Sequence, residues 1–122
     1  MHSLDMPAGW TVRLTATARA AVDRHRWDVL VYGRDAPATP RLAYGSHIGD
    51  GDCEQRIDIP AQEVDCRFEV RVRHAAVDGT WEDDWLTIVD DVPDRLDLGF
   101  SDRSQAVAHD NDVLLSFVLT SP

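Results

Sequence analysis

The chain has 122 residues, which is enough for one domain that buries its own core. It carries 22 acidic residues against 12 basic ones, and a net charge of −10 argues against nucleic acid or a bare anionic membrane as partner. Every basic residue is an arginine, which excludes lysine nucleophiles and Schiff bases. The sequence has no apolar run of about 18 residues and no signal-peptide pattern, so we expect a cytoplasmic location without membrane insertion.

Apolar and polar side chains alternate with a period of two along most of the chain, which predicts β-strands. The pattern is clearest in 66–77, where the apolar face ends in His74, a residue we expect to be hydrogen-bonded in the core. The predicted strands are, in chain order, 10–22, 27–33, 41–48, 53–59, 66–77, 86–89, 95–100 and 113–119. We expect 1–9 to be a loose N-terminal segment, and the proline-bearing segments 34–40 and 90–94 to be loops.

Short strands separated by frequent turns predict a single all-β domain over 1–122, an antiparallel β-sandwich of about seven to eight strands. A flattened β-barrel or a C2-like sandwich is the alternative. If 53–59 pairs with 64–74 across the short loop 60–63, Cys53 lies opposite Val70 rather than Cys66. We therefore expect two free thiols, and the alternative is a disulfide formed in another register or between the sheets.

Residues 59–79 resemble part of the fibronectin type III module. The resemblance rests on IPA at 59–61, FEVRVR at 68–73 and VDG at 77–79, which are similar to that family's corner, penultimate strand and following hairpin turn. The tyrosine that the family keeps at the corner is absent here. The resemblance implies an immunoglobulin-like topology and a role in interaction.

Acidic loops are predicted to gather at one end of the sandwich. Successive loops alternate between the two ends when neighbouring strands run antiparallel, and 23–26, 49–52, 78–84 and 101–112 then share an end. Calcium binds six to eight oxygen ligands from loops of this kind. The predicted ligands are Asp50, Asp52, Asp83, Asp84, Asp110 and Asp112. The alternative is a solvated, turn-forming rim, since no EF-hand pattern is present.

Two further features predict ligand binding. Trp81 and Trp85 flank three acidic residues, and an exposed ring beside carboxylates is suited to stacking on a sugar. The alternative is that Trp85 caps the core and Trp81 covers a loop. Arg71 and Arg73 belong to an outward row that can bind an acidic partner or a carboxylated ligand. The favoured alternative is that these arginines form cross-strand ion pairs.

Motifs for catalysis are missing from the sequence. It contains no G-x-S-x-G, no zinc-type histidine spacing and no C-x-x-C. We therefore expect a non-catalytic β-sandwich module that recognises a protein or a carbohydrate, with no cofactor. A Ca²⁺-dependent module is the alternative, and a small hydrolase using two acids of the rim is a third. Edge strands can pair with another chain, so a homodimer is a further possibility.

Overall fold

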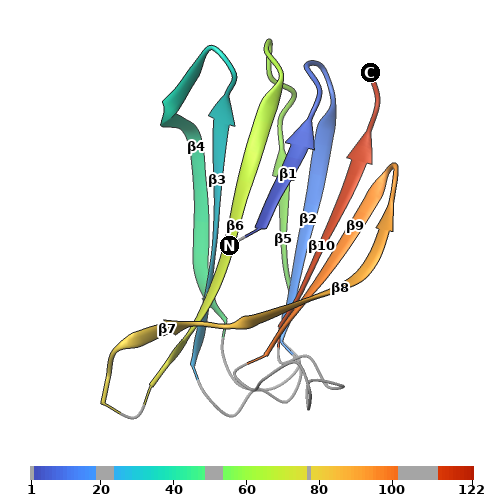
Figure 1. The fold of residues 1–122 in the computed structure, drawn as a ribbon. Coiled ribbons are helices and arrows are strands. Elements are labelled where there is room, and N and C mark those ends of the chain that lie inside the picture. Colours follow the sequence, from blue (N-terminus) through green and yellow to red (C-terminus); the bar gives the residue numbers. More distant parts are fainter. Residues whose placement is uncertain (1, 19–23, 49–53, 77, 102–112) are drawn as a thin grey trace.

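A computed structural model describes residues 2–18, 24–48, 54–76, 78–101 and 113–122. The described residues form ten strands in two antiparallel sheets and no helix, which confirms the all-β prediction (Figure 1). The first sheet has the spatial order β1 (His2–Met6), β6 (Cys66–Ala75), β3 (His25–Gly33) and β4 (Ala36–Ile48), and β7 (Trp81–Asp83) also pairs with β6. The second sheet has the order β5 (Glu54–Ile59), β2 (Thr11–Ala18), β10 (Val113–Thr120), β9 (Arg95–Ser101) and β8 (Trp85–Val92).

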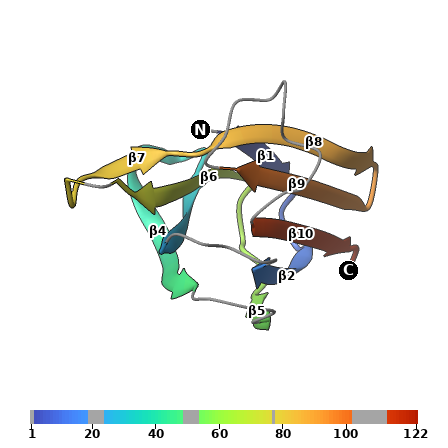
Figure 2. The ribbon, with the colours of Figure 1, turned by 90° about the horizontal axis from the view of Figure 1, so that it is seen from below.

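The core lies between the two sheets, which face each other when the molecule is seen from below (Figure 2). Burial alternates along β3, β6 and β10 because every second side chain points to the opposite sheet. Phe68 of β6 and Phe117 of β10 meet across the core with ring centroids 6.4 Å apart. Trp27 crosses the sandwich by donating from Nε1 to Gln55 Oε1 of β5 at 2.7 Å. For β6 the face that forms the core is the apolar face that the sequence predicts.

The first sheet differs from the prediction at both of its edges. The segment 1–9, predicted to be loose, contains β1, which pairs with β6 from His2 to Met6. The segment 34–40, predicted to be a loop, contributes the start of β4 despite Pro37 and Pro40. β4 is an edge strand, so no neighbouring strand lies on its open side. On that side, the N–H groups that its prolines lack remove no hydrogen bond between strands.

Two more differences concern the second sheet. The strand predicted over 86–89 runs from Trp85 to Val92, so part of the predicted loop 90–94 is strand. The supposed pairing of 53–59 with 64–74 is absent, because β5 pairs with β2 and the connection 60–65 crosses to the other sheet. The alternation of apolar and polar residues predicts which face of a strand is buried, but it does not predict which strand it pairs with. The immunoglobulin or fibronectin type of topology is not confirmed by this strand order.

Asp97 of β9 is a buried carboxylate on the outer side of the second sheet. Burial raises its pKa, but hydrogen bonds from Arg95 Nη2 and Ser116 Oγ, both 2.6 Å long, outweigh burial and hold the pKa below its usual value. Because the pKa falls, the protein stabilises the ionised form of this group.

Cys66 is a free, buried thiol on the inner face of β6, and its Sγ donates to the Val64 carbonyl at 3.3 Å. Burial raises the pKa of this thiol. Cys53 lies outside the described residues. None of the described residues forms a helix long and apolar enough to cross a membrane.

Candidate functional site

One continuous ribbon passes from the first sheet to the second (Figure 2). Trp81–Asp83 pairs with β6, Asp84 follows, and from Trp85 onward the chain pairs with β9. The two tryptophans that the sequence predicts as one site are therefore in different sheets. Trp81 is half-buried beside β6, whereas Trp85 is 53% exposed on the edge strand β8. The prediction that one of these rings is exposed is fulfilled by Trp85.

The outward side chains of β3, β6 and β7 form a surface that we name the charged face. Strand register puts Asp28 of β3 opposite Arg71 of β6, and Arg73 of β6 opposite Asp83 of β7. The members of the charged face are Asp28, Leu30, Glu69, Arg71, Arg73, Trp81 and Asp83. Both arginines that the sequence predicts as ligand-binding residues thus lie on the same face as Trp81.

Ion pairs hold the charged face in place. Arg71 Nε donates to Asp83 Oδ1 at 2.6 Å, and this hydrogen bond raises the pKa of Arg71 and lowers the pKa of Asp83. Asp28 lies between two arginines, with Oδ2 3.1 Å from Arg73 Nη2 and Oδ1 3.1 Å from Arg26 Nη2. The favoured prediction of cross-strand pairing is confirmed for these arginines. The ion pairs fix the orientation of these side chains. The donor and acceptor atoms that the pairs do not use therefore point in fixed directions.

A shallow hollow lies within the charged face. It has a volume of about 350 Å³ and is lined by Asp28, Leu30, Glu69, Arg71 and Arg73. Gly45 of β4 makes room for this arrangement, because a Cβ atom at that position would collide with the Asp28 carboxylate. The hollow combines one apolar side chain with carboxylate acceptors and guanidinium donors.

Trp81 borders the charged face and contacts two more side chains. Its ring centroid lies 5.7 Å from that of His47, and the Arg24 guanidinium lies 5.8 Å from the ring centroid. A cation at this distance from an aromatic ring is attracted by the ring's quadrupole. Trp81 therefore offers a ring whose position is fixed by His47 of β4 and by Arg24, which directly precedes β3.

Asp84 is buried where the chain changes sheets. Its Oδ1 lies 2.6 Å from His74 Nδ1 and its Oδ2 lies 3.1 Å from His25 Nε2. His25 and His74 are opposite each other in neighbouring strands, on the inner face. The prediction that His74 is a hydrogen-bonded core residue is confirmed. We assign this His–Asp–His cluster a structural role, because the Asp84 side chain is 0% exposed.

The structure does not bring together the two predicted calcium ligands that it describes. Asp83 is exposed and paired with Arg71, and Asp84 is buried between histidines. Asp50, Asp52, Asp110 and Asp112 lie outside the described residues. In the ranges that the structure does describe, no three or more His, Cys, Asp or Glu side chains are grouped to hold a metal ion.

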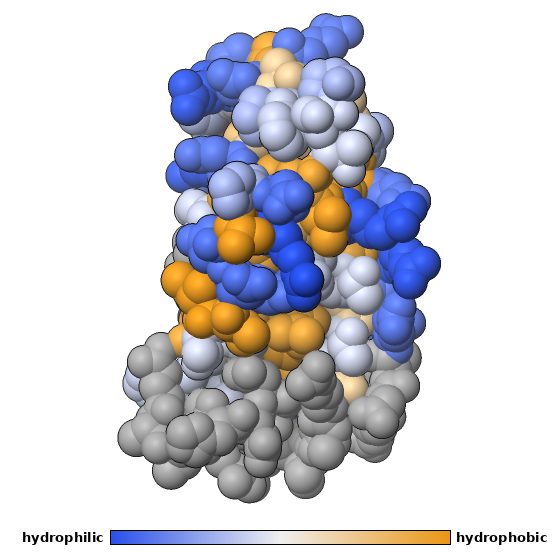
Figure 3. Space-filling view, turned by 90° about the vertical axis from the view of Figure 1, so that its right-hand side faces the viewer, coloured by the Kyte–Doolittle hydropathy of each residue, from blue (hydrophilic) through white to orange (hydrophobic). Residues whose placement is uncertain are grey.

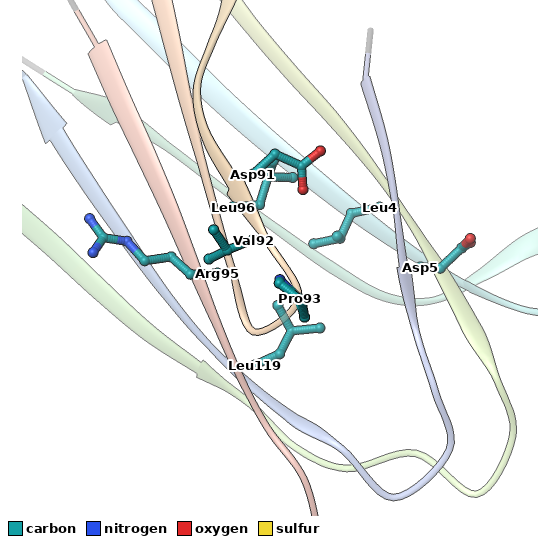
Figure 4. A pocket seen from close by; sticks show the side chains of 8 residues that line it. All are labelled: Leu4, Asp5, Asp91, Val92, Pro93, Arg95, Leu96 and Leu119. Carbon is teal, nitrogen blue, oxygen red and sulfur yellow. The ribbon is translucent and has the colours of Figure 1, made fainter.

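A second hollow, of about 370 Å³, lies between β1 and the β8–β9 hairpin (Figure 4). Its lining is mainly apolar and includes Leu4, Val92, Pro93, Leu96 and Leu119. Three acidic or basic side chains, Asp5, Asp91 and Arg95, complete it. This groove opens on the side of the sandwich opposite β4 and β5.

Sequence reasoning missed Asp28, Leu30 and Gly45 as parts of the charged face. The alternation of Arg26, Asp28 and Leu30 along β3 carries a signal for the outward face. That signal predicts a part of the charged face only when β3 is known to pair with β6. The two strands are far apart in sequence.

No family model and no curated protein matches this sequence. Two solved structures with a similar fold are described as lectins. The Chromobacterium violaceum lectin CV2L, in complex with alpha-methyl-fucoside, is 15% identical with a TM-score of 0.53, over 94% of this chain and 92% of that one. The Ralstonia solanacearum high-affinity mannose-binding lectin is 14% identical with a TM-score of 0.51, over the same shares. These comparisons show a common fold.

Proposed function

We propose that this chain is a non-catalytic carbohydrate-binding module. Two solved structures that share its fold over nearly their whole length are named as lectins, one in complex with alpha-methyl-fucoside and one as mannose-binding. A shared fold does not fix a function, so the proposal also needs a suitable surface on this chain. The charged face is that surface.

The single observation that carries the proposal is the hollow of paired charges on the same face of the sheet as Trp81. Sugar hydroxyls both donate and accept hydrogen bonds, and Asp28, Glu69, Arg71 and Arg73 offer acceptors and donors around one space. The apolar face of a pyranose ring can stack on an indole. Ion pairs keep these side chains ordered before binding, which lowers the entropy that a ligand must overcome.

Calorimetry with soluble monosaccharides tests the proposal, beginning with methyl fucosides and mannosides. We expect Trp81→Ala and Arg73→Met each to weaken binding by about tenfold or more, since each removes about 1.4 kcal/mol or more of contact. Trp85→Ala is the matched control for the ring, because that tryptophan lies on the other sheet. Arg13→Met is the control for the charge, because Arg13 pairs with Asp58 on the other sheet.

The outcomes separate three cases. Loss of binding in Trp81→Ala and Arg73→Met, with both controls intact, supports the charged face. Equal binding by all four variants would place the sugar elsewhere and contradict this site. No binding across a broad glycan panel would refute the carbohydrate proposal itself.

Calcium-dependent binding is the second candidate, and the strand ends favour it. Ala18 pairs with Val113 and His25 pairs with Ile48, so the strands that border 19–23 and the aspartate-bearing segments 49–53 and 102–112 end at the same end of the sandwich (Figure 1). A ligand that binds only the folded state must raise the melting temperature. An identical melting temperature in EDTA and in excess Ca²⁺ would remove this candidate.

A further inference from the structure

The charged face carries a local surplus of positive charge, although the whole chain has a net charge of −10. Its ion pairs join four guanidiniums to three carboxylates, because one carboxylate, that of Asp28, serves two arginines. The pairs are Arg26 with Asp28, Arg73 with Asp28, Arg71 with Asp83 and Arg67 with Glu69. One positive charge of this network is therefore not balanced within it.

Other charges on the same side of the first sheet do not cancel the surplus. Asp5 of β1 lies opposite Arg67 and adds a negative charge. Arg24 lies over the Trp81 ring and adds a positive one. Glu82 is on the other parity of β7 and lies 3.5 Å from a histidine of the inner face. Among the described residues, five guanidiniums thus face four carboxylates on this side.

Arg71 and Arg73 keep hydrogen-bond donors for a ligand. A guanidinium has several N–H groups, and Arg71 donates from Nε to Asp83 while Arg73 donates from Nη2 to Asp28. Arg73 Nε is buried without a hydrogen-bond partner among the residues that the structure describes. Both arginines line the hollow of the charged face. Since two N–H groups of an arginine match the two oxygens of a carboxylate, the hollow has donor capacity for such a group.

The second hollow has the opposite charge balance. The side of the sandwich on which β8 and β9 lie carries hydrophobic patches between hydrophilic groups (Figure 3). The hollow between β1 and the β8–β9 hairpin is lined by two carboxylates, Asp5 and Asp91, and by one arginine, Arg95. That arginine already donates to Asp97 at 2.6 Å. An anion is therefore disfavoured in this hollow and favoured in that of the charged face.

The negative charge of the whole chain does not prevent a small anion from binding. Salt screens charges beyond about 8–10 Å, so a single carboxylate in the hollow interacts mainly with the guanidiniums that line it. A nucleic acid or a membrane instead presents many charges to the whole surface of the chain. The local surplus thus selects a small anionic ligand.

We propose that the sugar bound at the charged face carries a carboxylate, as a uronic acid does, and that Arg71 and Arg73 bind this group. The inference rests on the proposed function and names the class of its ligand. The carboxylate accepts from the N–H groups that Asp83 and Asp28 leave unused, and its charge balances the surplus of guanidiniums. Asp28 and Glu69 accept hydrogen bonds from hydroxyl groups of the same sugar ring.

Calorimetry at neutral pH with pairs of methyl glycosides tests the inference. Each pair consists of a neutral sugar and its uronic acid, so that the two ligands differ only in the oxidation of C6: glucoside and glucuronide, galactoside and galacturonide, mannoside and mannuronide. We expect the uronide of at least one pair to bind about tenfold more tightly than its neutral partner, because hydrogen bonds to a charged group are the stronger ones.

Three variants locate the preference for the acid. Asp83→Asn frees Arg71 from its acidic partner and should raise the preference by about threefold, whereas Arg71→Gln should lower it by about threefold or more. Asp58→Asn is the matched control, because Asp58 also forms an exposed ion pair with an arginine, Arg13, but on the other sheet. It changes the net charge of the chain by the same amount as Asp83→Asn and should leave the preference unchanged.

Circular dichroism confirms that each variant is folded before its affinities are compared. Neutral sugars that bind as tightly as their uronides overturn this inference and leave the proposed function standing. A preference that rises equally in Asp83→Asn and Asp58→Asn, or that does not fall in Arg71→Gln, also overturns it. If neither kind of sugar binds, the proposed function itself is refuted.

Discussion

Asp83 and Asp84 are neighbours in sequence but have opposite surroundings, which makes them a matched pair for measuring the His–Asp–His cluster. The Asp83 side chain is 57% exposed, and that of Asp84 is fully buried. Asparagine keeps the size of aspartate but removes the charge and one acceptor oxygen. Asp84→Asn therefore leaves two buried imidazoles with a single neutral acceptor between them.

The expected cost follows from burial. A buried polar group that loses its partner typically costs about 1–3 kcal/mol, and more when the lost partner is charged, as a carboxylate is. Asp84 lies against both His25 and His74, so we expect Asp84→Asn to cost about 4 kcal/mol of unfolding free energy. Asp83→Asn breaks only the exposed pair with Arg71, and such pairs contribute about 0–1 kcal/mol.

Urea unfolding followed by circular dichroism measures both changes under the same conditions. With a slope of about 2 kcal/mol per molar, the midpoint of Asp84→Asn falls by about 2 M and that of Asp83→Asn by less than about 0.5 M. Equal midpoints for the two variants would refute the structural role of the cluster. The same holds if Asp84→Asn unfolds at the wild-type midpoint.

Three other predictions concern the core and two titrating groups. Gln55→Ala leaves the buried Trp27 Nε1 without its acceptor and should cost about 1–3 kcal/mol in the same urea assay, and no loss would contradict the cross-sheet bond. The folded pKa of Asp97 lies below its unfolded value, so its stabilisation is present above about pH 4 and is lost as the pH falls through the folded pKa. The stability difference between wild type and Asp97→Asn should therefore shrink in acid, and a constant difference would refute this. In a Cys53→Ser variant, in which Cys66 is the one thiol, the raised pKa of Cys66 should make its reaction with Ellman's reagent slow in the native state and fast in urea, whereas fast native labelling would contradict its burial.

The sequence determines which side of each strand faces the core. The alternation is seen in the burial of all of Thr11–Ala18 and of β6 from Cys66 to Arg73, whereas the last residues of β6 are all partly buried. This works because a strand's side chains alternate whatever its neighbours are. The outward position of Arg71 and Arg73 follows from the same alternation.

The tertiary structure decides which strands are neighbours, and with them the composition of the site. Asp28 joins Arg73 only because β3 lies beside β6, although 45 residues separate the two in sequence. Trp81 and Trp85 lie in different sheets because the chain changes sheets at Asp84. The Asp84 side chain is buried, although the sequence pattern groups it with exposed acidic residues. Strand pairing depends on the total burial and hydrogen bonding of two whole sheets, so no local pattern contains it.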